Sequence, residues 1–318
     1  MVAQTTTQPV AEAFAAERAF AVDRAIAAWR AISGDASDFG GAAVIADGEK
    51  SLVVRLHRPG PGPNVMAKRA SPDALAAEVH VYTHLLAGSG ARPRFRGVGD
   101  DGAGGRWIFI EDAGGEAYDA GNPAHARLAG QWLARLHATV MRAAGPADVV
   151  LPHRGAAFYL DRARSARSTL DRRLSDACDV GDAAIVRRCV AICDSLEAGW
   201  ASVAAAAAAV PDTLVHGDIA AENVRIDGDE VVVFDWEKAA WGTPAVDLAR
   251  VDVAAYASAA GDGGRPIGLD DVARAAAAGS VLRTLSHNWA AKPVGKLERY
   301  ARRLAREMRR IGVEVESP

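Results

Sequence analysis

Cysteine is scarce in this chain: Cys178, Cys189 and Cys193 are the only three in 318 residues. Their odd number, with no CxxC pair, argues against a disulfide framework and against a zinc site. Cys189 and Cys193 are one helical turn apart, which predicts that they share a buried helix face. This usage is typical of a reducing compartment, so a cytoplasmic location is the expectation.

An excess of charge of one sign and long apolar runs are also missing. The formal net charge is −3 and is spread through the chain, which gives no electrostatic argument for a nucleic-acid partner. The longest apolar run, residues 203–210, is far too short to span a bilayer. No basic segment followed by an apolar one opens the chain, so no signal peptide is expected. The sequence has neither a GxSxG nor an HExxH motif, which argues against a hydrolase. Nothing in the sequence indicates a protein partner.

The informative stretch is residues 214–237, which read LVHGDIAAENVRIDGDEVVVFDWE. Two strand-like runs, residues 213–215 and 231–234, lie at its start and near its end, and each run ends in a polar cluster. A structural explanation alone is a β-hairpin with a polar turn at Asp227-Gly228. That explanation is compatible with a functional one, because the hairpin would carry the site.

The polar residues of this stretch have the layout that a phosphoryl-transfer site needs. Asp218 follows the first run, Asn223 comes five positions later, and Asp235 follows the second run. One carboxylate can accept or orient the proton of an attacking hydroxyl, while an amide oxygen and a second carboxylate hold magnesium on the nucleotide phosphates. Mg²⁺ prefers such hard oxygen ligands and leaves room for water and phosphate.

The segment HGDIAAEN resembles the catalytic loop of the small-molecule phosphotransferases related to protein kinases, the group that includes aminoglycoside and choline kinases. The resemblance implies that Asp218 is the catalytic base and that Asn223 and Asp235 bind Mg²⁺, with ATP or GTP as cosubstrate. It also implies structural roles for His216 and for Asp247, which lies in TPAVDLARV. There Asp247 would begin a helix and brace the catalytic loop through its backbone.

The N-terminal part of the chain reads as a helix followed by an antiparallel meander and a second helix. Turn residues separate the strand-like runs. Ser71 is suited to be the N-cap of the second helix, with Pro72 in its first position. The expected helices are residues 11–32 and 71–86, and the expected strands are residues 42–46, 51–57, 64–69, 92–98 and 106–111.

Lys68 ends the third of these strands, and Glu78 lies in the helix that follows. In kinases this order allows the glutamate to hold the lysine against the nucleotide phosphates; taken singly, each residue reads as a solvated side chain. The kinase GxGxxG loop is absent, and by resemblance the first hairpin turn, with Gly48 and Ser51, would cover the phosphates. The alternative candidates for that role are Gly40 and Gly41.

The segment IFIEDAGG passes from an apolar strand to a polar connector. By resemblance it is the hinge between two lobes, with Glu111 and Ala113 exposed to the adenine; the plain alternative is a strand end and a surface loop. The implied fold is α+β and two-lobed, like a protein kinase. Residues 1–113 would form the small antiparallel-sheet lobe and residues 114–318 the mainly helical lobe.

Beyond residue 114 the pattern is helical. An alanine-rich tail at residues 201–209 extends one of the expected helices, and residues 259–264 read as a flexible loop. The expected helices are residues 124–141, 158–174, 182–203, 269–285 and 296–311.

The function that follows from the resemblance is a small-molecule kinase that transfers the γ-phosphate of ATP or GTP to a hydroxyl. Only the short KAAWGTPAVD replaces the activation segment of protein kinases, so a protein substrate has no evident platform. A nucleotide-binding pseudokinase is the alternative, but no catalytic residue has been lost. The acceptors that fit are amino-sugars or aminoglycoside antibiotics; phosphorylation of an antibiotic would make the chain a resistance enzyme. The alternative acceptors are choline-like amino-alcohols and other sugar-like metabolites.

Two residues near Asp235 are candidates for acceptor binding. In an extended backbone neighbouring side chains point to opposite faces, so Trp236 is expected in apolar packing and Glu237 on the cleft side. There Glu237 would attract an ammonium group of the acceptor or face the metal; alternatively, it pairs with Lys238 at the surface. Trp241 is expected in the short loop beyond it.

Overall fold

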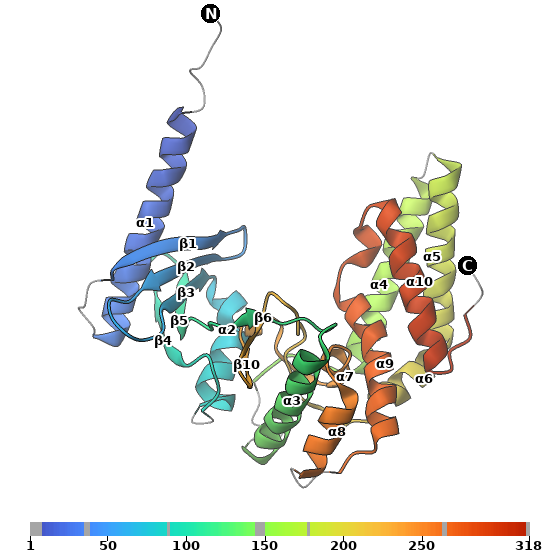
Figure 1. The fold of residues 1–318 in the computed structure, drawn as a ribbon. Coiled ribbons are helices and arrows are strands. Elements are labelled where there is room, and N and C mark those ends of the chain that lie inside the picture. Colours follow the sequence, from blue (N-terminus) through green and yellow to red (C-terminus); the bar gives the residue numbers. More distant parts are fainter. Residues whose placement is uncertain are drawn as a thin grey trace, which may run out of the picture. The chain divides into compact units, whose positions relative to one another are not determined.

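The computed structural model describes residues 8–34, 39–87, 90–143, 150–176, 179–262 and 266–315, and the side chains of the first helix from Phe20 onward. These residues form two compact units (Figure 1). The first unit contains the chain up to Glu116 together with Arg225–Gly228 and Val232–Glu237, and the second contains the remainder. The predicted lobes, 1–113 and 114–318, differ from this division because Asp235 and its neighbours pack with the first unit.

The first unit is built on an antiparallel sheet with the strand order β1-β2-β3-β5-β4. Alternating apolar residues in these segments place one side of each strand in the core. The register pairs Lys68 with Val53 on one side and with Ile108 on the other, so Lys68 lies on the central strand. The strands are β1 (Gly41–Asp47), β2 (Leu52–His57), β3 (Val65–Ala70), β4 (Phe95–Asp100) and β5 (Arg106–Glu111).

The C-terminal part of helix α1 (Gln8–Ser33) packs against this sheet (Figure 1). Trp29 is buried against Phe109 of β5, with ring centroids 5.4 Å apart in an edge-to-face arrangement. Val54 and Leu56 of β2 are fully buried in the same cluster. Burial of large aromatic side chains contributes most of the stabilisation of such a core.

Helix α2 (Pro72–His80) begins as its sequence predicts. The Ser71 hydroxyl accepts a hydrogen bond from Ala74 N at 3.3 Å, and Pro72 occupies the first position. The predicted helix 71–86 does not stay regular, because Val81–Leu85 forms a π-helical segment, η1. Glu78 is buried near the end of α2.

The second unit is mainly helical. Helices α4, α5, α9 and α10 lie side by side, and α3 packs against α8 (Figure 1). Cys189 and Cys193 are both buried on α5, as predicted, whereas Cys178 lies outside the described residues. The helices are α3 (Pro123–Ala143), α4 (Ala156–Ser175), α5 (Val180–Ala198), α6 (Trp200–Ala207), α7 (Ala245–Leu248), α8 (Val253–Asp262), α9 (Leu269–Ser286) and α10 (Val294–Arg310).

The prediction of one helix over 182–203 was wrong, because the chain breaks at Gly199 between α5 and α6. A Cβ on Gly199 would lie 2.4 Å from Val313 Cγ1, so the close approach of the C-terminal segment requires glycine there. Among the described residues no single helix is long and apolar enough to cross a membrane. Helices α5 and α6 meet that test of length and composition only as a pair, and they are bent by 64°.

The flexible loop predicted at residues 259–264 was also misplaced. Helix α8 continues to Asp262, since its alanine-rich sequence favours helix. Residues 263–265 lie outside the described part of the chain.

Short strands surround the catalytic-loop candidate. Strand β8 (Thr213–Val215) lies in the sheet β7-β11-β8, with β7 (His153–Arg154) and β11 (Ala240–Gly242). The other short sheet has the order β10-β9-β6, from β6 (Glu116–Ala117), β9 (Val224–Asp227) and β10 (Glu230–Val233). The two runs noted in the sequence are therefore not partners: the hairpin is β9–β10, and its turn uses Gly228 at φ 62°.

A substitution at Gly279 on α9 tests the packing of α7 against α9. A Cβ built on Gly279 would lie 1.7 Å from Ala245 O, so the Gly279→Ala variant must move backbone. We expect it to lose about 1–3 kcal/mol of unfolding free energy or more. Gly295→Ala, where a Cβ meets nothing within 4 Å, is the control and should lose none. Equal stability of both variants in urea titrations would contradict this packing.

Candidate active site

Lys68 is the centre of a charge cluster in the first unit. Its Nζ lies 2.8 Å from Glu78 Oε2 and 2.5 Å from Asp235 Oδ1, and Glu237 Oε2 is 3.9 Å away. The side chain of Lys68 is only 14% exposed and that of Glu78 is 1% exposed. The structure therefore brings together four residues that the sequence proposed for nucleotide, metal and acceptor binding.

The electrostatics keep Lys68 charged. Burial alone would lower the pKa of Lys68, but the attraction of Glu78 and Asp235 outweighs it and raises the pKa. Burial raises the pKa of Glu78, and the neighbouring lysine opposes that effect. Removing the lysine would leave a buried carboxyl group without its cation.

The backbone at Asp235 is not extended. Asp235 has φ 65°, a left-handed conformation that is uncommon for a residue other than glycine. The next three residues form a 3₁₀ turn, η3 (Trp236–Lys238). Trp236 is fully buried, as expected, but the argument from an alternating extended backbone was wrong. The turn instead directs Glu237 to the Lys68 cluster.

A pocket of about 590 Å³ in the first unit includes Lys68 and Glu237 in its lining. The β1–β2 turn supplies Gly48 and Ser51 to the same pocket, and Gly48 N donates to Ser51 O at 3.0 Å. Both residues proposed to cover the phosphates thus lie beside the lysine. The alternative candidates, Gly40 and Gly41, pair with His57 at the opposite end of β1 and do not line this pocket.

Glu111 and Ala113, the residues proposed to face adenine, are both buried at the end of β5. The Glu111 carboxylate forms an ion pair with Arg96, and Glu111 N donates to Arg94 O at 2.9 Å. The carboxylate and the N–H of Glu111 are therefore both engaged within the first unit.

In the second unit the segment after β8 is held by Asp247. The carboxylate of Asp247 accepts from His216 N at 2.7 Å and from Gly217 N at 2.9 Å. His216 is buried, and its Nδ1 accepts from Asp218 N at 3.2 Å. Gly217 has φ 81°, which explains glycine where protein kinases have arginine. These bonds fix the backbone from which the Asp218 side chain extends.

Both carboxylate oxygens of Asp218 are occupied by cations. Lys238 Nζ is 2.7 Å from Oδ2, and Arg283 Nη2 is 3.0 Å from Oδ1. Burial would raise the pKa of Asp218, but hydrogen bonding and attraction by Lys238, followed by Arg283, lower it overall. Sequence reasoning considered Lys238 only as a partner of Glu237. It gave no indication of Arg283, which is 65 positions from Asp218 in the sequence.

Asn223 also belongs to this segment and is buried. Its Nδ2 donates to Asp218 O at 3.1 Å, which leaves the amide oxygen as the atom that can bind a cation. Asp235 uses Oδ1 for Lys68, and its second oxygen is a similar hard donor. Each of these oxygens is a hard donor of the kind that Mg²⁺ prefers.

Trp241 does not lie in a loop. It is buried on β11, where it pairs with Leu214 of β8 and His153 of β7. The loop expectation failed because the short segment after Asp235 forms a turn and then a strand. An indole in this position packs in the core, and the structure gives no support to its proposed contact with an acceptor.

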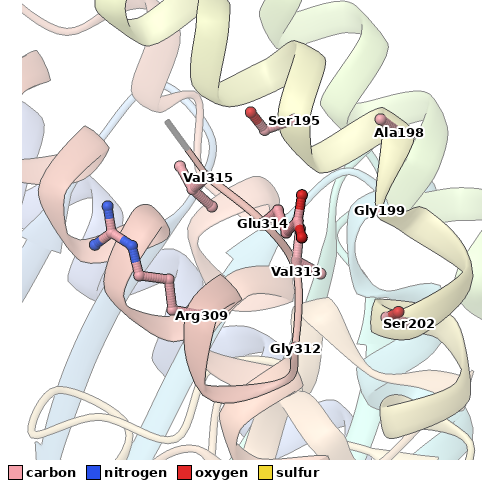
Figure 2. A pocket seen from close by; sticks show the side chains of 9 residues that line it. All are labelled: Ser195, Ala198, Gly199, Ser202, Arg309, Gly312, Val313, Glu314 and Val315. Carbon is pink, nitrogen blue, oxygen red and sulfur yellow. The ribbon is translucent and has the colours of Figure 1, made fainter. Parts of the chain in front are cut away.

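A pocket of about 930 Å³ lies elsewhere in the second unit. Figure 2 shows its lining at the junction of α5 and α6 and along the C-terminal segment that carries Val313 and Glu314. None of the candidate site residues lines it. We therefore place the site by the clustered charges and hydrogen bonds and not by cavity size.

Comparison with known proteins supplies the family. The sequence model of the phosphotransferase enzyme family, APH, matches residues 28–284. No curated protein matches the chain significantly. A solved choline/ethanolamine kinase family protein from Mesorhizobium loti is 20% identical, with a TM-score of 0.55 over 93% of this chain and 95% of that one. The GDP and kanamycin complex of APH(2")-IIIa is 12% identical, with a TM-score of 0.57 over 90% and 98%.

At these identities the solved structures establish the fold, which is the two-lobed α+β fold of protein-kinase-like phosphotransferases, as predicted. The family match covers most of the chain, including Lys68, Asp218 and Asp235. The chain belongs to the phosphotransferase enzyme family and is a phosphotransferase with an alcohol group as acceptor.

Proposed function

We propose that this phosphotransferase is a Mg²⁺-dependent small-molecule kinase that transfers the γ-phosphate of ATP or GTP to a hydroxyl. The observation that carries the proposal is the Lys68 cluster, in which one half-buried cation is held by Glu78 and Asp235. A lysine so held is a fixed positive charge for phosphate oxygens.

The nucleotide side of the proposal uses the first unit. Lys68 binds the phosphates, and Glu78 holds it in position. Gly48 and Ser51 of the β1–β2 turn line the same pocket and cover the phosphates with backbone and hydroxyl donors. The adenine or guanine edge is bound by the backbone near Glu111 and Ala113.

Asn223 and Asp235 would hold the magnesium ion through their side-chain oxygens. When bound, such an ion neutralises the charge that develops on the transferred phosphoryl group. Asp235 also keeps Lys68 in place, so it acts on the phosphates through both cations.

Asp218 is the proposed general base, which accepts the proton of the acceptor hydroxyl. His216 and Asp247 position it through the backbone of the loop. Its lowered pKa keeps the carboxylate ionised at neutral pH, the state that a base requires. Lys238 and Arg283 must yield at least one carboxylate oxygen to the hydroxyl.

The acceptor is the finer part of the proposal. Two solved structures of the same fold are described as a kanamycin complex and as a choline/ethanolamine kinase family protein, which makes an amino-sugar or amino-alcohol the first class to assay. Glu237 adds no support, since it lies 3.9 Å from Lys68 in the phosphate pocket. A cytoplasmic location, which gives access to ATP, belongs to this finer proposal, and a role in antibiotic resistance would follow only if an aminoglycoside proved to be the acceptor.

The test is nucleotide consumption by the purified chain with Mg²⁺, with and without a panel of hydroxylated small molecules. Acceptor-dependent release of ADP or GDP, with a phosphorylated product seen by mass spectrometry, is the expected result. Nucleotide binding without any acceptor-dependent turnover would favour the pseudokinase alternative.

The pH dependence of turnover tests the contact between Lys238 and Asp218. The acid limb of kcat/KM reports the pKa of the base in the free enzyme. Lys238 lowers the pKa of Asp218, so Lys238→Met should raise it and move the acid limb to higher pH. Lys296→Met, at an exposed position on α10, is the matched control. An acid limb that stays in place in both variants would show that Asp218 is not the titrating base.

A further inference from the structure

The proposed base is surrounded by cationic side chains from several elements of the second unit. Arg283 comes from α9 and Lys238 from η3, and both contact Asp218 directly. Arg154 of β7 donates to Lys238 O at 2.9 Å, and its Nη1 is 3.7 Å from where a Cβ on Gly217 would lie. These residues, together with Arg250 after α7 and Arg303 on α10, are called the basic cluster below: Arg154, Lys238, Arg250, Arg283 and Arg303.

Three nitrogen atoms of this cluster are buried without a hydrogen-bond partner among the described residues. They are Arg154 Nε, Arg250 Nε and Arg283 Nη1. A buried donor that lacks an acceptor costs about 1–3 kcal/mol. A ligand with several acceptor oxygens would remove that cost.

The basic cluster carries more positive charge than the nearby carboxylates carry negative charge. Burial and then repulsion from Arg250 and Arg283 lower the pKa of Arg303. The carboxylate of Asp247 already accepts two backbone N–H bonds. Glu307, which also faces Arg303, is held by Arg306 and Arg310. Asp218 is therefore the main carboxylate that the cluster contacts.

We propose that the acceptor carries an anionic group, a carboxylate or a phosphate, next to the hydroxyl that is phosphorylated. This inference rests on the proposed kinase function. The anionic group binds Arg283 and Lys238 in place of Asp218, with the bidentate geometry that a guanidinium offers. The displaced Asp218 carboxylate then becomes available to the acceptor hydroxyl. An ammonium group in this position would meet like charge, which selects against it.

The alternative role of Arg283 and Lys238 is to contact the phosphoryl group during transfer. In that case they would act equally on every acceptor, whatever its charge. The two uses are separated by charge selectivity, and by anion binding when no nucleotide is present.

The first experiment measures binding of inorganic phosphate by calorimetry to the full chain carrying Lys68→Met, which removes the phosphate-binding cation of the first unit. Adding Arg283→Gln should weaken phosphate binding about tenfold or more. Adding Lys238→Gln instead should have the same effect, and this position tolerates change because the Lys238 side chain is 37% exposed. Arg274→Gln, an exposed arginine of the same helix, should leave it unchanged. Undetectable phosphate binding, or binding that Arg283→Gln and Lys238→Gln leave unchanged, would overturn the inference.

The second experiment measures turnover on matched acceptors that differ in one group, namely glucose, glucosamine, glucuronate and glucose 6-phosphate, within a wider panel of hydroxy acids and amino-alcohols. Preference for anionic members, reduced about tenfold or more by Arg283→Gln, supports the inference, and the carboxylate and phosphate arms identify the anion. Preference for aminated or neutral acceptors overturns it while leaving the kinase function intact. Absence of turnover across the whole panel would count against the kinase function itself, and the phosphate titration would still decide whether the cluster binds anions.

Discussion

Asp218→Asn is expected to reduce phosphoryl transfer by about 10²–10⁴-fold while leaving nucleotide binding nearly unchanged. The physical reason is the separation of tasks in the proposed site. In that proposal Asp218, on the loop held by Asp247, would accept the acceptor proton, whereas Lys68 and Asp235 would act on the nucleotide. The measurement is single-turnover transfer alongside titration of ATP.

Asp161→Asn, at an exposed position on α4, makes the same chemical change away from the site and should have normal turnover. The asparagine at 218 keeps its size and can still hydrogen-bond, so loss of folding is not the expected cause of inactivity. Full turnover by the Asp218→Asn protein on its true acceptor would remove Asp218 from the role of base.

Asp235→Asn should weaken Mg²⁺–nucleotide binding and turnover together, with kcat/KM falling by about 10²-fold or more, or about 2.7 kcal/mol. In the proposed site the carboxylate would serve both the metal and Lys68, whose Nζ lies 2.5 Å from it. Asparagine is chosen because it tolerates the positive φ of this position better than alanine does. The measurement is the Mg²⁺ dependence of nucleotide binding and of turnover.

Asp227→Asn is the matched control, since Asp227 makes an exposed ion pair with Arg92 in the same unit. Such surface ion pairs contribute little to stability. The Mg²⁺ dependence of the Asp227→Asn variant should therefore equal that of the wild type. If Asp235→Asn behaved like this control, Asp235 would have no part in metal binding.

The parts of the fold that the sequence predicted depend on local patterns. The β5 strand, the N-cap of α2 and the Lys68–Glu78 order are each encoded by neighbouring residues, and the structure shows the resulting contact at 2.8 Å. The family and the class of reaction were also predicted correctly, because Asp218, Asn223 and Asp235 lie close together in sequence.

The parts that the sequence missed depend on contacts between distant residues or on unusual backbone. The break at Gly199 arises from packing against Val313, and the turn after Asp235 arises from a positive φ that no local signal predicts for aspartate. Arg283 reaches Asp218 only because α9 packs in the second unit. The acceptor class stays a prediction, which was made from Glu237 without knowledge of the charge that α9 brings to Asp218.

The most direct test of the proposed kinase function is acceptor-dependent phosphoryl transfer by the wild type and by Asp218→Asn, measured side by side with Mg²⁺ and ATP or GTP. We expect a phosphorylated hydroxyl compound from the wild type and about 10²–10⁴-fold less from the variant, with equal nucleotide binding. Equal product from both proteins, or nucleotide binding without product from either, would contradict it.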